Sequence, residues 1–494
     1  MKTKYDFYQT HLEWESIDFP ITITRIYFEK KLYDLPPDCV IEVWRGIDFK
    51  LKAIISGIAS SPKALEIDVE KLEDNFIPKE TIVGQSIDGL YTIELSGCII
   101  AQTTSSQHSI DTLEVRFRSD LLIESITRKI NFEYKPVILY EWYLSAKLSA
   151  WFPRNTKRSL NKNFRKTRDE IDPSEENNLI ESSGSSRDFI LINSHGIKCI
   201  VAIVPDQFGP EWAQKMCIEY RTEFGEIPSD NDRQAISELV SFVLGCQLLR
   251  IGSTSVSKNQ GIVSQFAMNQ WGDNVIAKCS KRASPPVDVN RYTNDWQRLE
   301  IVVNELLPKY LQLREKLQLK DSLWKYWIAC DSSVGTNLPI FSSAVESLAN
   351  LYLKEHTEIK LTYMDVEEYQ KLIADELSSI SIKLDRFNFR DILLNKIKNA
   401  PLRGGNEKIN LFFESINLPI GAIEKNAIKA RNKMAHSSIG KADLKKLNEY
   451  VQLTHAYQTL FHRIILRILN YEGSYIDYYS SNQIDRNIKD VISR

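Results

Sequence analysis

Residues 18–135 mix β-branched and aromatic residues with polar ones in short stretches. Pro, Gly and Ser residues bound these stretches, as they do where strands end in turns. The clearest stretches are residues 21–28, 40–44, 51–58, 91–100 and 112–117. The pattern predicts a β-rich N-terminal domain over residues 1–140, folded as a sandwich or a barrel.

A mixed α/β region is predicted over residues 141–285. Apolar residues fill 189–192 and 197–204, which predicts a hairpin with its turn at 193–196. His195 falls in that turn, and we interpret it as a turn residue and not as a catalyst. The pattern over residues 210–250 predicts helices, with a strongly apolar stretch at 235–249. The acidic, Ser-rich stretch 169–188 predicts a flexible connection.

From residue 294 onward, apolar residues recur at helical spacing. A boundary is expected at 280–290, where Pro285 and Pro286 interrupt regular structure. The pattern predicts a helical bundle over residues 291–475 and a tail over 476–494, so the fold class is α+β with several domains. The expected helices are 296–319, 323–330, 339–354, 365 to the 380s, 389–397, 408–415, 423–436 and 442–470.

Length and composition narrow the class of protein. A chain of 494 residues with 43% hydrophobic content predicts two to four domains with buried cores. No apolar stretch resembles a signal peptide or reaches the ~18 residues of a membrane span, so we expect a cytoplasmic protein without membrane partners. The net charge of −2 means that any surface for RNA is local.

Several kinds of site are disfavoured by the sequence. The seven cysteines include no CxxC pair, which argues against disulfide frameworks and zinc sites. Walker A, G-x-G-x-x-G, G-x-S-x-G and H-E-x-x-H motifs are absent. We therefore expect neither a cofactor nor a metal. His455 and His462 lie seven residues apart, close to one helix face, and core packing explains them better than a metal or a second proton donor.

A basic run follows the β-rich region. Between residues 151 and 168 the chain has no acidic residue, and Trp151, Phe152 and Phe164 interleave with the cations. Aromatic rings among cations are typical of surfaces that stack and hold nucleic acid, which predicts binding of RNA or phage nucleic acid. A solvated basic loop explains the run equally well. The cations are Arg154, Lys157, Arg158, Lys162, Arg165, Lys166 and Arg168.

The strongest candidate for chemistry lies in residues 430–436. Arg431, Asn432 and His436 stand near the end of a predicted helix that we expect to finish around 437–440. At about 100° per residue, Arg431 and His436 lie roughly 140° apart on one helix, so sharing a face requires a helix break before the histidine. An ordinary explanation remains open, with the arginine on the helix dipole and the histidine as a cap.

With these residues in place, the last 200 residues resemble a HEPN domain, a helical module of many prokaryotic defence and toxin ribonucleases. Its signature is an Arg, then a polar residue, then a His four to six positions after the Arg. Residues 341–348 resemble the apolar helix of larger HEPN proteins that carries one acidic residue, here Glu346. A long N-terminal region before a C-terminal HEPN domain is similar to ApeA-type anti-phage proteins.

RNA cleavage without a metal fits these three side chains. The ribose 2′-OH attacks phosphorus, so the site needs a group that moves protons near pH 7 and a cation for the phosphorane. A histidine with an ordinary pKa near 6.5 serves the first need, and an arginine fork the second. Asn432 holds the phosphate or orients the imidazole through its amide. The products are a 2′,3′-cyclic phosphate and a 5′-OH, and DNA resists.

The resemblance implies more than the residues do. HEPN ribonucleases pair two copies of the motif across a two-fold axis, which implies a homodimer formed through this domain. It also implies an anti-phage or toxin effector in abortive infection, restrained by its N-terminal region until a phage-derived trigger acts. The alternative is a non-catalytic HEPN-like module that dimerises or binds RNA without cutting it.

Overall fold

The computed structural model divides into two compact units, residues 1–285 with 289–305 and residues 286–288 with 306–494. Helix α5 (Arg298–Leu313) contains the last boundary between them. The first boundary between the units, after Pro285, falls inside the predicted boundary region 280–290. The structure describes residues 6–7, 21–33, 35, 38–59, 79–107, 115–147, 156–159, 162–165, 189–204, 211–257, 261–270, 275–289, 298–436 and 444–493. The predicted connection at 169–188 lies outside them.

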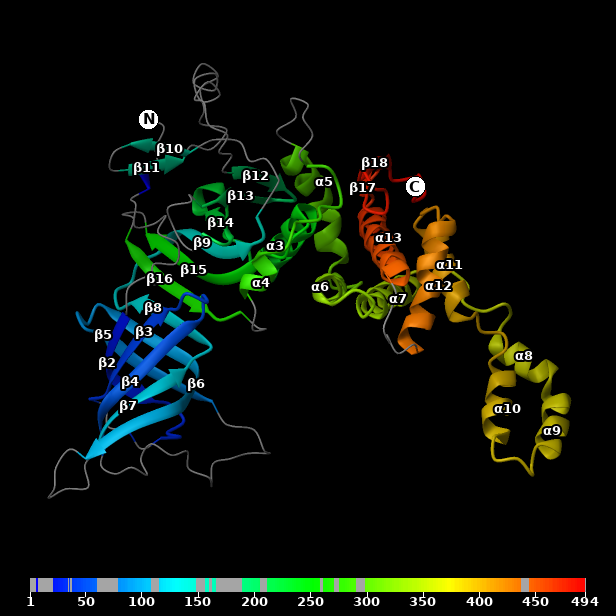
Figure 1. Ribbon diagram of the computed structural model, residues 1–494, viewed down its shortest axis with the longest axis horizontal. Helices are drawn as coiled ribbons and strands as arrows, with labels where there is room; N and C mark the ends of the chain where they lie inside the picture. Colours follow the sequence, from blue (N-terminus) through cyan, green and yellow to red (C-terminus); the bar gives the residue numbers. More distant parts are fainter. Residues whose placement is uncertain are drawn as a thin grey trace, which may run out of the picture. The chain divides into compact units, whose positions relative to one another are not determined.

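The N-terminal strands close into an antiparallel barrel (Figure 1). Going around it, the order is β6-β5-β2-β3-β4-β7, and β7 pairs back with β6. A barrel was one of the two folds predicted from the strand pattern. The strands are β2 (Ile21–Phe28), β3 (Val40–Arg45), β4 (Leu51–Ala59), β5 (Glu80–Ser86), β6 (Tyr91–Gln107) and β7 (Val115–Leu122).

Alternating side chains and one bend explain how the barrel closes. In β7 buried and exposed residues alternate throughout, so Phe117 and Leu121 point inward. Strand β6 changes partner midway, pairing with β8 up to Ser96 and with β7 from Ile99. Gly97 lies between these stretches with φ +68°, a conformation that favours glycine, and a Cβ there would collide with Glu124.

The sheet continues beyond the barrel. Seven further strands follow in the order β8-β16-β15-β9-β14-β13-β12, and together the strands make one antiparallel 13-stranded sheet. The expected domain boundary at residue 140 falls inside β9. The strands are β8 (Ser125–Ile130), β9 (Pro136–Ser145), β12 (Phe189–Ser194), β13 (Ile197–Ile203), β14 (Gln214–Arg221), β15 (Leu249–Ser257) and β16 (Ile262–Met268).

The structure confirms the predicted hairpin of this region but only part of the predicted helices. Strands β12 and β13 confirm the hairpin, and His195 (φ 53°) and Gly196 (φ 75°) form its two-residue turn. The helices expected over 210–250 are half wrong, because only α3 (Asp230–Leu244) is a long helix and 214–221 is strand β14. Every residue of β14 after Gln214 is buried, so no alternation reveals the strand.

The second unit is helical, as predicted for the C-terminal region. Helix α7 contacts α6, α11, α12 and α13, and it buries several apolar side chains, among them Phe341 and Leu348. Among the described residues, no helix is both long and apolar enough to cross a bilayer. The helices are α6 (Leu319–Asp331), α7 (Asn337–Glu355), α8 (Val366–Leu372), α9 (Ala374–Lys383), α10 (Arg390–Lys398), α11 (Gly405–Ser415), α12 (Ala422–His436) and α13 (Leu444–Ile468).

The last residues of the chain belong to this unit. The segment 476–494, expected as a tail, contributes to an antiparallel hairpin of β17 (Ser474–Asp477) and β18 (Ile484–Asn487). Strand β17 contacts α13, and Ile488 and Ile492 are buried. The apolar positions in this segment are too few to distinguish a packed hairpin from a tail by sequence pattern alone.

Candidate functional site

The Arg-Asn-His motif closes helix α12. The backbone is helical through His436, so the break before the histidine that a shared face would require is not there. Helical periodicity separates positions 431 and 436 by roughly 140° around the axis. One copy of α12 therefore does not present both positions on one face. The side chains of residues 431–436 lie outside the described part of the structure.

A buried ion pair fixes the first turn of α12. The Glu424 and Arg463 side chains are both 0% exposed, and Arg463 Nη1 lies 2.6 Å from Glu424 Oε1. The same carboxylate accepts hydrogen bonds from the backbone N–H of Ile492 at 2.9 Å and of Gly421 at 3.0 Å. Arg463 also donates to the carbonyl of Pro419 at 2.9 Å. The helix carrying the motif is thus anchored to α13 and to the C-terminal segment.

Burial sets the electrostatics of this pair. Loss of water lowers the pKa of Arg463, although Tyr475 and Glu424 oppose the change. The Arg463 guanidinium also lies 5.0 Å from the centre of the Tyr475 ring. Sequence analysis missed the pair, since its partners are 39 residues apart. The available signal was Arg463 within the largely apolar stretch of residues 460–466.

Glu346 lies on a neighbouring helix. It is half-buried in α7 and accepts a hydrogen bond from Ser342 Oγ at 3.2 Å. Helix α7 packs directly against α12. The acidic residue therefore belongs to a helix that borders the one carrying the motif.

The basic run is partly a β-hairpin and not a loop. Lys157 and Arg158 lie in β10 (Thr156–Ser159), and Lys162 and Arg165 lie in β11 (Lys162–Arg165). The two strands pair antiparallel, and β11 also pairs with β1 (Asp6–Phe7). These four cations are described by their backbone alone. Arg154, Lys166 and Arg168 lie outside the described residues.

His462 is a core residue, as predicted. It is 0% exposed, and its Nε2 lies 2.6 Å from the Tyr326 hydroxyl, which also accepts a hydrogen bond from Gln458 at 3.2 Å. Tyr326 stacks on Phe461 with ring centres 4.7 Å apart. Burial lowers the pKa of His462 to about 3, and burial also lowers the pKa of His455. At neutral pH His462 is an uncharged part of the core.

The buried histidine makes the second unit sensitive to acid. In the unfolded chain a histidine takes up its proton near pH 6.5, whereas folded His462 does so at about pH 3. Between these values the unfolded state binds more protons, so the free energy of unfolding decreases as the pH falls. Linkage gives a loss of about 2 kcal/mol from pH 7 to pH 5 for this group.

Hydrogen exchange of peptides from α6 and α13 measures this loss. The wild-type opening free energy should fall between pH 7 and pH 5, and the fall should shrink by about 2 kcal/mol in His462→Gln. His455 shifts stability in the same direction, so the difference between the two proteins isolates His462. Equal pH dependence in both proteins would contradict the assignment.

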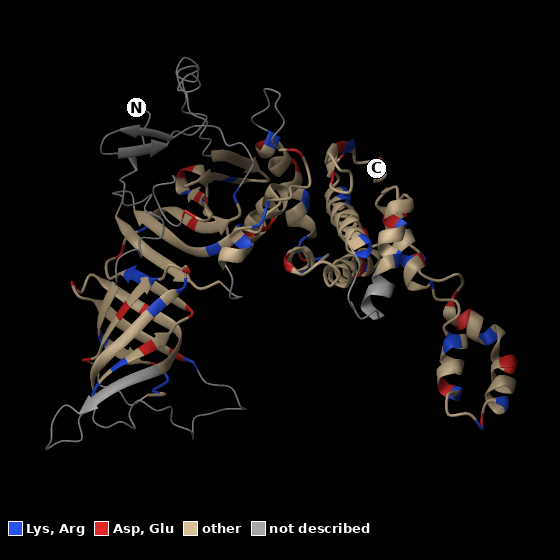
Figure 2. Ribbon diagram, viewed as in Figure 1, with Lys and Arg blue, Asp and Glu red and all other residues tan. Residues whose placement is uncertain are grey.

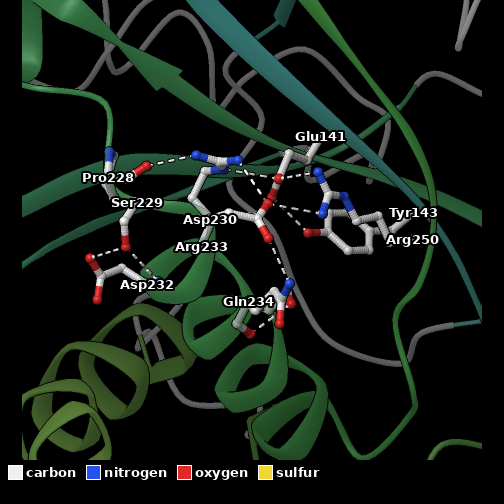
Figure 3. Close-up of polar contacts among 10 residues, drawn as sticks. Glu141, Tyr143, Pro228, Ser229, Asp230, Asp232, Arg233, Gln234 and Arg250 are labelled. Atoms are coloured by element: carbon white, nitrogen blue, oxygen red, sulfur yellow. Dashed lines mark hydrogen bonds and ion pairs between the residues drawn. The ribbon is translucent and has the colours of Figure 1, made fainter. Parts of the chain in front are cut away.

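A second polar network joins α3 to the sheet of the first unit (Figure 3). The Glu141 carboxylate of β9 is 1% exposed and pairs with Arg233 Nε at 3.0 Å and Arg250 Nη2 at 2.9 Å. It also accepts a hydrogen bond from the Tyr143 hydroxyl at 2.8 Å. Asp230, in the first turn of α3, pairs with the same two arginines at 2.9 and 3.2 Å.

The charges of this network balance one another. Burial raises the pKa of Asp230, but Arg250 and Arg233 outweigh it, and the net shift is downward. Burial and the neighbouring Glu141 raise the pKa of Tyr143 well above its usual value, so the phenol stays protonated. Two carboxylates and two guanidiniums thus hold α3 on the sheet as a structural clamp. The signal in the sequence was an acid within the apolar run 138–144.

Neutralising Glu141 tests this clamp. Glu141→Gln leaves two largely buried guanidiniums short of one negative charge, and we expect opening of α3 and β15 to become easier by about 2–3 kcal/mol. Hydrogen exchange of peptides from both elements measures this. Exposed Glu226 supplies the matched Glu→Gln control. An equal response of the two variants would show that the network does not hold α3.

The chain matches no family model, no curated protein and no solved structure. The resemblance to HEPN domains accordingly depends on the motif of α12 and its helical setting.

Proposed function

We propose that this chain is a metal-independent RNA endonuclease of the HEPN type, with Arg431, Asn432 and His436 at its active site. The observation that carries the proposal is the position of the motif at the C-terminal end of α12, within a helical unit. The buried Glu424–Arg463 pair anchors the start of the same helix. A catalytic group on an anchored helix is held more accurately than one on a loop.

In this proposal His436 and Arg431 divide the chemistry. The imidazole of His436 takes the proton of the ribose 2′-OH as O2′ bonds to phosphorus. The P–O5′ bond then breaks, and O5′ receives a proton from an imidazolium. Arg431 stabilises the negative charge of the phosphorane, and Asn432 donates a hydrogen bond to a phosphate oxygen.

A second copy of the motif completes the site. On the uninterrupted helix, positions 431 and 436 face different directions, so a single copy supplies one group to any given phosphate. A two-fold axis brings the arginine of one protomer near the histidine of the other. The same His436, protonated when it takes the 2′-OH proton, then supplies the proton for O5′.

Other parts of the chain take supporting roles. Glu346, on the adjoining helix α7, positions groups of the active site, and the basic run that includes Lys157 and Arg165 binds RNA. The N-terminal region restrains the nuclease, since uncontrolled RNA cleavage is toxic. Release by a phage-derived trigger makes the protein an abortive-infection effector in the cytoplasm.

Analysis of RNA ends tests the proposed reaction. Purified protein is incubated with end-labelled RNA in excess chelator, and the termini of the fragments are identified by enzymatic treatment. We expect fragments with 2′,3′-cyclic phosphate and 5′-OH ends. Cleavage that requires added metal and leaves 5′-phosphates would contradict the proposed mechanism. Binding without cleavage would favour the non-catalytic HEPN-like module.

A further inference from the structure

Three short helices form an excursion between α7 and α11, here called the α8–α10 lobe (residues 363–401). Its base is closed by a bridge between Thr362 and Leu402, and Tyr363 N–H donates to the carbonyl of Pro401 at 2.9 Å. Asp365 caps α8 by accepting hydrogen bonds from the N–H groups of Glu367 and Glu368. Helix α10 packs against α8 and α9 (Figure 1).

The lobe lacks a core of its own. None of the residues of α8, α9 or α10 is buried. Large apolar side chains are instead exposed on all three helices, with Leu372 at 70%, Ile382 at 77% and Ile392 at 61%. Helices this short are not stable in water without packing. An exposed apolar group on such helices is characteristic of a surface that another molecule covers.

Charge divides the lobe into two halves. Residues 365–376 contain five acidic residues and one basic residue, a net charge of −4. Residues 383–401 contain five basic and two acidic residues, a net charge of +3. Both kinds of charge are visible on the three helices in Figure 2. The lobe therefore has a net charge of only −1, with its acidic and basic residues in separate halves.

Charged side chains of both halves of the lobe are exposed and can form ion pairs with another molecule. Glu367 and Glu368 on α8 and Lys396 and Lys398 on α10 are all exposed. Among the described residues, none of these four side chains has an ion-pair partner. A partner that covered the lobe would have to offer basic groups to α8 and acidic groups to α10. The lobe itself has that pattern.

We propose that the α8–α10 lobe binds the same lobe of a second copy of this chain about a two-fold axis. In such an isologous interface each acidic α8 faces the basic α10 of the other copy, and the pairing occurs twice. The exposed Leu372, Ile382 and Ile392 are covered at the same time. The proposal depends on the lobe residues alone. Dimers that survive the charge reversals would overturn it and leave the two-copy site of the RNA-cleavage proposal intact, whereas a strictly monomeric protein would overturn both.

Two charge-reversal variants test the proposal in the full-length protein. One is Glu367→Lys with Glu368→Lys, and the other is Lys396→Glu with Lys398→Glu. Each variant alone opposes like charges at both contacts, and we expect its dimer dissociation constant to rise at least about 100-fold. A 1:1 mixture of the two variants restores opposite charges at both contacts, and we expect a heterodimer. Analytical ultracentrifugation measures the assembly, and circular dichroism checks the fold.

The mixture separates pairing between chains from pairing within one chain. A matched control, Lys354→Glu with Lys445→Glu, reverses two exposed lysines outside the lobe and should remain dimeric. A wild-type protein that stays monomeric would overturn the proposal, as would dimers that survive either reversal. The proposal would also be overturned if a single chain carrying all four reversals recovered the wild-type assembly and the 1:1 mixture did not. The charges would then pair within one lobe. A monomer that binds RNA through the lobe overturns it too.

Discussion

Arg431→Ala and His436→Ala should each reduce RNA cleavage at least about 100-fold in kcat/KM, because each removes a group that acts in the transition state. Arginine stabilises the phosphorane, and histidine carries the proton, so neither loss is replaced by water. Lys425→Ala is the matched control, since it removes an exposed cation from the same helix. Cleavage that persists in both motif variants would exclude this motif as the active site.

A mixture of the two inactive variants gives a sharper form of the same prediction. If the site combines Arg431 of one protomer with His436 of the other, a mixed dimer contains one intact site and regains activity. Co-expression ensures that mixed dimers form, and the initial rate of RNA cleavage reports the recovery. A mixed dimer that stays inactive would require both groups to come from one chain.

Glu424→Gln should be the most destabilising substitution in the helical unit, with a loss of about 3–5 kcal/mol. It leaves Arg463, which is 0% exposed, as an uncompensated charge in the core. Hydrogen exchange of α12 and α13 peptides measures the change in opening free energy. Glu449→Gln, at an exposed position of α13, is the matched control and should leave exchange almost unchanged.

A paired substitution distinguishes loss of the ion pair from a general disturbance of packing. Replacing Glu424 by Gln and Arg463 by Met together removes both charges, so the penalty of a lone buried cation disappears. We expect the double variant to be more stable than Glu424→Gln alone. If the two losses simply add, the pair does not couple α12 to α13 in the way described.

The strands and helices could be predicted wherever one face of the element contacts water. Strand β7 alternates buried and exposed residues, and α13 has a clear apolar stripe, so both patterns are visible in the sequence. Strand β14 escaped prediction because both of its faces are covered. The choice between a sandwich and a barrel could not be made from the sequence, since the pairing of β6 with β7 depends on a change of partner at Gly97.

The candidate site could be predicted in position but not in geometry. Motif spacing located Arg431 and His436 at the end of a helix, and the helix ends there. Whether the helix breaks before His436, as a shared face would require, could not be decided from the sequence, because local patterns do not fix the last residue of a helix. The ion pairs of Glu424 and Glu141 involve partners distant in sequence, which local patterns do not connect.

Cleavage of an RNA with a single 2′-deoxy nucleotide tests the central claim most directly. The substitution is made on the 5′ side of a mapped cleavage site, and the reaction is run in excess chelator. The account predicts that cleavage stops at that linkage and continues at unmodified sites, because the attacking hydroxyl is missing only there. Continued cleavage at the modified linkage would contradict attack by the 2′-OH, and with it the proposed roles of Arg431 and His436.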